Sequence, residues 1–312
     1  MRRAEIILVY SLFIMVAVAT SCEEEFTPIT DFSPPDIVVE GYIEGGDNAT
    51  SPYVILTRSI PFFSELDLNA VDSFFVHDAD IIVSTSGDTV FLEEFCLSEL
   101  SDAQREIIAQ SFNIGVDTAG LDFCVYLDPT FSLSGEESKT YELEIKVDDK
   151  LINASTLVPK KSKISNYTFF DIPGVPNDSL RELRVTLEDP PNEANFYRYF
   201  TSINEAGMLA PTQSVVNDLF FDGDQFVLPL AKAESADVQF NLDTYGYYRV
   251  GDTVDIKFCT IDEGHYDFWS TLEFNKANQG PFSSYTAISY NTNGAIGIWG
   301  GYSCSIQRLI VE

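Results

Sequence analysis

The residues best suited to acid–base or metal chemistry are rare in this chain. It contains 2 histidines, His77 and His265, in 312 residues. Serine hydrolysis needs a nucleophile, a base and an oxyanion hole, but the sequence has neither a GxSxG turn nor an HExxH helix. His265 lies near Asp262 and Asp267 and is a candidate base, although a capped or partly buried histidine is the commoner explanation. The sequence therefore predicts no catalytic residues.

Carboxylates are so abundant that close pairs carry little information. The chain has 49 acidic and 18 basic residues and a formal net charge of -31, so pairs resembling those of glycosidases are expected by chance. Asp218, Asp222 and Asp224 surround Gly223 but lack the full spacing of a calcium loop. We therefore predict no metal and no cofactor. The negative charge also argues against nucleic-acid binding.

Cysteine chemistry points to disulfides. Beyond Cys22 the chain has Cys96, Cys124, Cys259 and Cys304, and no CxxC motif. In an oxidising compartment an even number of cysteines pairs readily. Proximity in sequence favours Cys96–Cys124 and Cys259–Cys304, but three connectivities are possible, and free buried cysteines are the alternative.

Aromatic residues give the one positive indication of a binding surface. Exposed aromatic rings supply flat apolar area for sugars, peptides or a partner protein, whereas core packing is the alternative for each ring. The candidates lie in or beside expected loops: Phe220, Phe221, Tyr245, Tyr247, Tyr248 and Trp299.

Strands are the elements expected to position these residues. From Tyr141 to Val147, apolar residues alternate with Glu142, Glu144 and Lys146, and the chain then turns at Asp148 and Asp149, as in a β-hairpin. Similar patterns predict strands at 37–43, 53–57, 80–84, 125–127, 183–187, 196–203, 254–258 and 295–302. Many short strands of this kind predict an all-β protein built from immunoglobulin-like or fibronectin-like β-sandwiches.

Helices and domain boundaries are secondary to that pattern. One short helix is expected after Ser101, inside the segment between Cys96 and Cys124, and another from Asp262 to a point before Gly280. A proline- and lysine-rich stretch at 159–163 predicts a linker. We therefore expect an N-terminal sandwich domain at 36–158, carrying the first helix, and a C-terminal sandwich domain at 159–312.

The N-terminal segment has the features of a lipoprotein signal. Arg2 and Arg3 precede an apolar run at 6–18 and then small residues before Cys22. This order predicts a secretory signal peptide over 1–21, with Cys22 lipidated, although a plain signal peptide with an incidental cysteine is the alternative. The acidic, proline-rich segment 22–35 is expected to be an extended tether.

Several segments, in their order and spacing, resemble a known family. They are 37–43 (IVVEGYI), 54–59 (VILTRS), 77–83 (HDADIIV), 141–145 (YELEI), 187–190 (LEDP), 195–197 (NFY), 280–282 (GPF) and 293–302 (NGAIGIWGGY). The chain is similar to domain-of-unknown-function family 4249, a group of Bacteroidetes lipoproteins. The resemblance implies an outer-membrane lipoprotein, displayed on the cell surface and associated with a TonB-dependent transporter. It implies no catalytic residue.

These observations favour a non-enzymatic binding or accessory subunit of a TonB-dependent outer-membrane nutrient-uptake complex. Its membrane contact would be the lipid anchor, and its ligand could be a small molecule, a glycan or a peptide. A structural or assembly partner of an outer-membrane barrel, without a solute ligand, is the alternative. A carboxylate-based hydrolase is the less favoured reading, because two isolated histidines supply no nucleophile–base pair. The sequence does not indicate which domain contacts the partner.

Overall fold

In the computed structural model of the chain, the segments in which apolar and polar side chains alternate form β-strands. The model describes residues 36–47, 49–60, 74–112, 122–172, 179–221, 223, 225–235, 238–278 and 287–312. Segments 1–21 and 22–35, including Cys22, lie outside the described residues, as do Asp222 and Asp224 of the acidic loop. The described part is mostly β, as the sequence predicts. None of its helices is long and apolar enough to cross a membrane.

Along the chain, the strands and helices fall into two consecutive groups. The first group is β1 (Ile37–Gly46), β2 (Thr50–Arg58), β3 (Asp80–Thr85), β4 (Asp88–Cys96), η2 (Leu97–Glu99), α2 (Asp102–Ser111), β5 (Cys124–Leu127), β6 (Lys139–Val147) and β7 (Lys150–Val158). The second group is β8 (Lys163–Asp171), β9 (Leu180–Glu188), β10 (Phe196–Ile203), β11 (Val215–Asn217), β12 (Gln225–Leu230), β13 (Tyr248–Arg249), β14 (Thr253–Ile261), α3 (Glu263–Ala277), β15 (Thr292–Asn293) and β16 (Ile296–Ile310).

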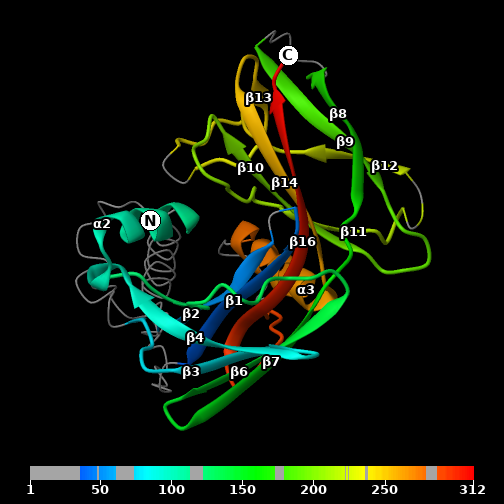
Figure 1. Cartoon of the computed structure of the whole chain (residues 1–312). Helices are drawn as coiled ribbons and strands as arrows, with labels where there is room; N and C mark the ends of the chain where they lie inside the picture. The colour runs from blue at the N-terminus through cyan, green and yellow to red at the C-terminus, as the bar shows by residue number, and fades with distance from the viewer. Residues whose placement is uncertain are drawn as a thin grey trace, which may run out of the picture. The chain divides into compact units, whose positions relative to one another are not determined.

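Twelve strands form one continuous sheet in the order β11-β10-β14-β16-β1-β2-β5-β4-β3-β6-β7-β15. Strand β16 connects the two parts of this sheet: its residues 296–304 pair with β1, and its residues 302–310 pair with β14. In Figure 1 this long strand runs from the side of β6 and β7 to the side of β13 and β14. The β1–β16 ladder is parallel, whereas the other ladders between described strands are antiparallel.

Two hydrophobic cores flank the long sheet. The first core lies among strands β1 to β7 and the start of β16. The second core lies between the four-stranded sheet of β8, β9, β12 and β13 and strands β10 and β14 of the long sheet. The predicted domain boundary near residue 159 falls between β7 and β8, which belong to different sheets. Because β16 contributes to both cores, the division into two domains stays a prediction.

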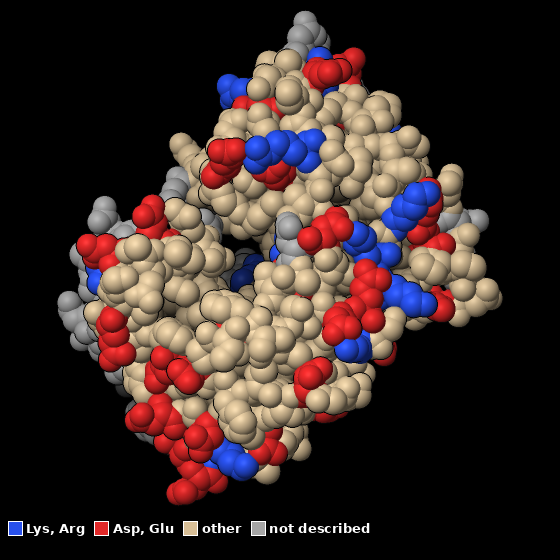
Figure 2. All heavy atoms as spheres, in the orientation of Figure 1, with Lys and Arg blue, Asp and Glu red and all other residues tan. Residues whose placement is uncertain are grey.

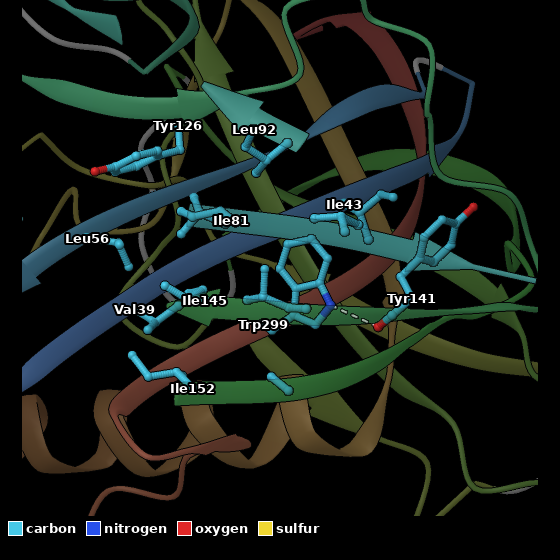
Figure 3. Packing of buried hydrophobic residues seen from close by; sticks show 14 of the residues in the cluster. Val39, Ile43, Leu56, Ile81, Leu92, Tyr126, Tyr141, Ile145, Ile152 and Trp299 are labelled. Atoms are coloured by element: carbon cyan, nitrogen blue, oxygen red, sulfur yellow. Dashed lines mark hydrogen bonds between the residues drawn. The ribbon is translucent and has the colours of Figure 1, made fainter. Parts of the chain in front are cut away.

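Trp299 is the largest side chain of the first core. It is fully buried, and its Nε1 donates to the Tyr141 carbonyl at 3.0 Å; Figure 3 shows the indole among Val39, Ile43 and Ile145. Gly41 makes room beneath it, since a Cβ there would lie 2.9 Å from the Trp299 ring. Trp299 therefore packs as a core residue and is not a surface contact.

Local signals in the sequence explain the hairpin and the helices. Asp148 and Asp149 both adopt left-handed φ angles, 49° and 60°, which suit the two-residue turn between β6 and β7. Helix α2 begins with a capping box formed by Ser101 and Gln104. Both predicted helices are confirmed, and α3 begins after the cap residue Asp262.

Both disulfides are confirmed as the pairs that proximity favours. Cys96 and Cys124 face each other on β4 and β5, and Cys259 and Cys304 face each other on β14 and β16. The first bond closes a loop that contains α2. The second lies inside the long sheet.

Candidate functional site

A cavity of about 1010 Å³ opens on the face of the long sheet opposite the two cores. Strands β1, β2, β5, β10, β14 and β16 contribute to its wall, and helices α2 and α3 cover its sides. In Figure 2 the surface is hollowed near the centre of the view, and a basic side chain is visible inside the hollow. Its charged and ring-bearing lining residues include Glu40, Tyr42, Glu44, Tyr53, Arg198, Phe200, Lys257, His265, Trp269 and Tyr302.

Strand alternation decides which side chains reach the cavity. On β1, Val39 and Ile43 enter the first core, so Tyr42 and Glu44 point to the other face of the sheet. On β14, Phe258 enters the second core, and the residues on either side of it, Lys257 and Cys259, face the cavity. Strand β16 pairs with β1 on one edge and with β14 on the other, so β1 and β14 lie close together.

Arg198 from β10 is a buried cation at the cavity wall. Its Cζ lies 3.6 Å from the centre of the Trp269 ring and 4.7 Å from that of Phe200. Its Nε donates to Ser214 Oγ at 3.2 Å, and the Ser214 amide and hydroxyl both donate to Glu273. The guanidinium therefore lies over the Trp269 indole and is linked through Ser214 to the carboxylate of Glu273.

Lys257 and Glu44 form a second buried charge pair. Lys257 Nζ lies 2.6 Å from Glu44 Oε2, and the exposed side-chain fractions are 18% and 5%. Burial raises the pKa of Glu44, and the charge of Lys257 opposes that effect. The ammonium also lies 5.1 Å from the centre of the Tyr302 ring.

His265, in the first turn of α3, lies against the sheet. Its Nδ1 is 3.3 Å from the Gly301 carbonyl, which can only accept, so Nδ1 carries the proton and Nε2 is an acceptor. Burial, followed by the charge of Arg198, lowers the pKa of His265 to about 3, which keeps the ring neutral. Gly300 permits this approach, because a Cβ there would lie 2.7 Å from Nδ1.

Asp262 fixes the position of His265. Its Oδ1 accepts from the His265 amide at 2.9 Å, and its Oδ2 accepts from Thr156 Oγ1 and the Leu157 amide on β7. Asp262→Ala is expected to reduce the free energy of unfolding by about 2 kcal/mol, because the N-cap of α3 and its link to β7 are both lost. Urea unfolding of the wild type and the variant measures this difference. A midpoint unchanged from the wild type would contradict the anchoring role.

The cavity collects polar atoms that have no hydrogen-bond partner. Among the described residues, five buried side-chain atoms make no hydrogen bond of normal geometry: Tyr42 Oη, Glu44 Oε1, Tyr248 Oη, His265 Nε2 and Trp269 Nε1. Tyr42 nevertheless interacts with Arg198 and Trp269. Four of them belong to cavity-lining residues, and only Tyr248 lies elsewhere, in the second core. Buried polar groups in native proteins normally find partners. The presence of four such atoms in one cavity therefore indicates that water or a ligand completes their hydrogen bonds.

The aromatic residues predicted as contacts do not line this cavity. Phe220 is 91% exposed, and Tyr245 and Tyr247 are partly buried. Phe221 and Tyr248 are buried in the second core, and Trp299 in the first. The prediction is wrong for these last three residues, because their rings are enclosed by core side chains and cannot touch a partner.

Neither histidine is paired with a nucleophile in the described part of the chain. His77 Nδ1 lies 2.5 Å from Glu94 Oε1, near Cys96 and Cys124. Both cysteines are oxidised to a disulfide, so they supply no thiolate for a metal. The side chain of His265 contacts a backbone carbonyl and aromatic rings. The cavity thus offers binding groups rather than a nucleophile–base pair.

Sequence reasoning missed Glu40, Glu44, Arg198 and Lys257. One signal was present: Arg198 stands in the middle of the aromatic run Phe196–Phe200, where a lone cation is unusual in a buried strand. The glutamates of β1 carried no such signal, because acidic residues are common throughout the chain.

The comparisons with known proteins identify a family without a described activity. A family model described as "Domain of unknown function (DUF4249)" matches residues 23–308. The curated proteins contain no match to this chain.

Proposed function

The chain belongs to the DUF4249 family, and from this premise we propose that it is a surface lipoprotein that binds a solute. In this proposal it is a non-enzymatic subunit of a TonB-dependent nutrient-uptake complex in the outer membrane. The observation that carries the binding role is the cavity with its four unpartnered buried polar atoms. Such atoms cost free energy when they stay unpaired, so a cavity kept in this state is suited to a ligand that pairs them.

The two cores fit the finer architecture that the sequence suggests. Each core is built from alternating apolar side chains of strands, the pattern of a β-sandwich interior. In the proposed arrangement each core is one immunoglobulin-like or fibronectin-like module, and the sheet that the modules share forms the floor of the cavity. The short helices α2 and α3 are additions that enclose it.

Gentle purification from native outer membrane tests the proposed role. A TonB-dependent barrel is expected to co-purify, and native mass spectrometry is expected to show a small molecule bound to the lipoprotein. Ser134→Trp should remove that mass without releasing the barrel, because Ser134 lines the cavity and an indole there occupies the ligand space. Ser86→Trp is the matched control, since Ser86 is exposed in the β3–β4 turn outside the cavity.

Each part of the proposal can fail separately. Absence of a barrel would remove the uptake-complex role. If a barrel co-purifies with the wild type but no small molecule is bound, the alternative is favoured. In that case the protein is a structural or assembly partner of the barrel and binds no solute.

Lipid anchoring has its own test. Cys22→Ala is expected to move the protein from the membrane fraction to the soluble fraction, because the acylated cysteine supplies the proposed anchor. Fractionation together with labelling by a fatty-acid analogue measures both location and modification. Membrane association that persists without label would mean that another contact holds the protein there.

A further inference from the structure

The unpartnered atoms of the cavity include both hydrogen-bond donors and acceptors. Glu44 Oε1 and His265 Nε2 accept, Trp269 Nε1 donates, and Tyr42 Oη does either. A hydroxyl group donates one bond and accepts others, so closely spaced hydroxyls satisfy such a mixed set. A carboxylate or phosphate only accepts when fully ionised, and would leave the acceptor atoms unpaired.

The buried charges at the cavity wall already have counter-charges within the protein. Lys257 is paired with Glu44, and Arg198 is linked through Ser214 to Glu273. An ionic ligand would lose its hydration without meeting an unpaired opposite charge, which is unfavourable. A neutral ligand avoids this cost. Anions also face the formal net charge of -31 carried by the whole chain.

Of the two carboxylates that line the cavity, Glu44 is paired with Lys257, whereas Glu40 forms no ion pair with another described residue. Its electrostatic surroundings include Arg198. Burial raises the pKa of Glu40, and the positive charge of Arg198 opposes that shift. The carboxylate therefore already has a positive charge of the protein in its surroundings.

Aromatic rings also line the cavity. Tyr53 and Phe112 meet edge to face at 4.9 Å, and Phe112 and Phe123 have ring centres 5.3 Å apart. Ile107 and Ile108 of α2 add to this apolar lining. The cavity lining thus combines polar groups with apolar side chains and rings. A ring whose edge carries hydroxyls and whose face is lined by C–H groups matches both.

From these features we infer that the ligand is a neutral polyhydroxylated molecule, an oligosaccharide without charged groups. This inference rests on the proposed binding function and specifies its ligand class. The volume of about 1010 Å³ is at the upper end of the range for small-molecule pockets, which favours an oligomer over a single sugar ring.

The test compares three probe classes on the purified full-length mature protein. An array carries neutral oligosaccharides beside uronate-containing and sulfated ones, and a set of tripeptides is measured by calorimetry. Neutral oligosaccharides are expected to bind. Tyr42→Phe should weaken that binding about threefold to tenfold, the effect of one hydrogen bond. Tyr248→Phe should leave it unchanged, because its equally unpartnered hydroxyl lies in the second core.

Other results separate the ligand class from the function. If charged oligosaccharides or peptides bind instead and Tyr42→Phe weakens them, the neutral class is wrong while the binding role stands. If no probe in any class binds, the inference is overturned. Native mass spectrometry of the complex, which detects a bound small molecule or its absence, then decides whether the protein binds a solute. An equal effect of Tyr42→Phe and Tyr248→Phe would place the binding outside this cavity.

Discussion

Trp299→Ala is expected to lower the free energy of unfolding by about 3–5 kcal/mol, the range for removing a large buried aromatic side chain. Trp299 is fully buried among side chains of β1, β6 and β7, and its Nε1 satisfies the Tyr141 carbonyl. The substitution leaves a cavity and removes that hydrogen bond. Because domains are commonly stable by only about 5–15 kcal/mol, a large share of the total would be lost.

Guanidinium unfolding followed by tryptophan fluorescence and circular dichroism measures this effect. Phe220→Ala is the control, because this ring is 91% exposed and its removal should change stability by no more than about 0.5 kcal/mol. Similar midpoints for the two variants would show that the first core does not depend on Trp299.

Lys257→Met is expected to be comparably destabilising, by about 3–5 kcal/mol, for an electrostatic reason. The substitution keeps the length of the side chain but leaves the buried Glu44 carboxylate without its counter-charge. The double variant Glu44→Gln with Lys257→Met should recover most of the loss, since no isolated charge remains. Lys163→Met is the matched control: Lys163 pairs with Glu188, but its side chain is 73% exposed, so a loss below about 1 kcal/mol is expected.

The loss of unfolding free energy caused by Lys257→Met should increase as pH rises. Without the lysine, burial raises the folded-state pKa of Glu44 further above the ordinary value of 4.5. The folded state then holds a proton that the unfolded state has released, so stability falls as pH rises between those two pKa values. The deficit is therefore largest at neutral pH and shrinks as pH falls toward 4.5. A deficit that is constant over this range would mean that lost packing, not the isolated charge, is responsible.

Much of the fold follows from local patterns in the sequence. The alternation at 141–147 and the Asp148-Asp149 turn specify the β6–β7 hairpin, and Asp262 marks the start of α3. Six strands were not predicted, namely β4, β8, β11, β12, β13 and β15. For β8 and β12 the reason is local. In β8 the pairing register shifts between Ser165 and Thr168, which interrupts the period of two. In β12, Pro229 argues against a strand, although proline is tolerated at a sheet edge.

The cavity could not be predicted in the same way. Tyr42, Arg198 and His265 are far apart in sequence, and they share one cavity because β1 pairs with β16 and β16 pairs with β14. Period-two alternation shows that a side chain points to one face of a strand, but it does not show which strand lies beside it. The six aromatic residues predicted as contacts were selected because they lie in or beside expected loops, and three of them are buried in the cores.

The parallel ladder between β1 and β16 also constrains the order of folding. Its two strands are separated by almost the whole described chain, so closing this loop has a high entropic cost. Contacts between such distant segments slow folding. During synthesis, β1 emerges long before β16 and has only β2 as a neighbour on one edge. The wall of the cavity is therefore incomplete in every partly emerged chain, and it closes only when the last long strand is inserted.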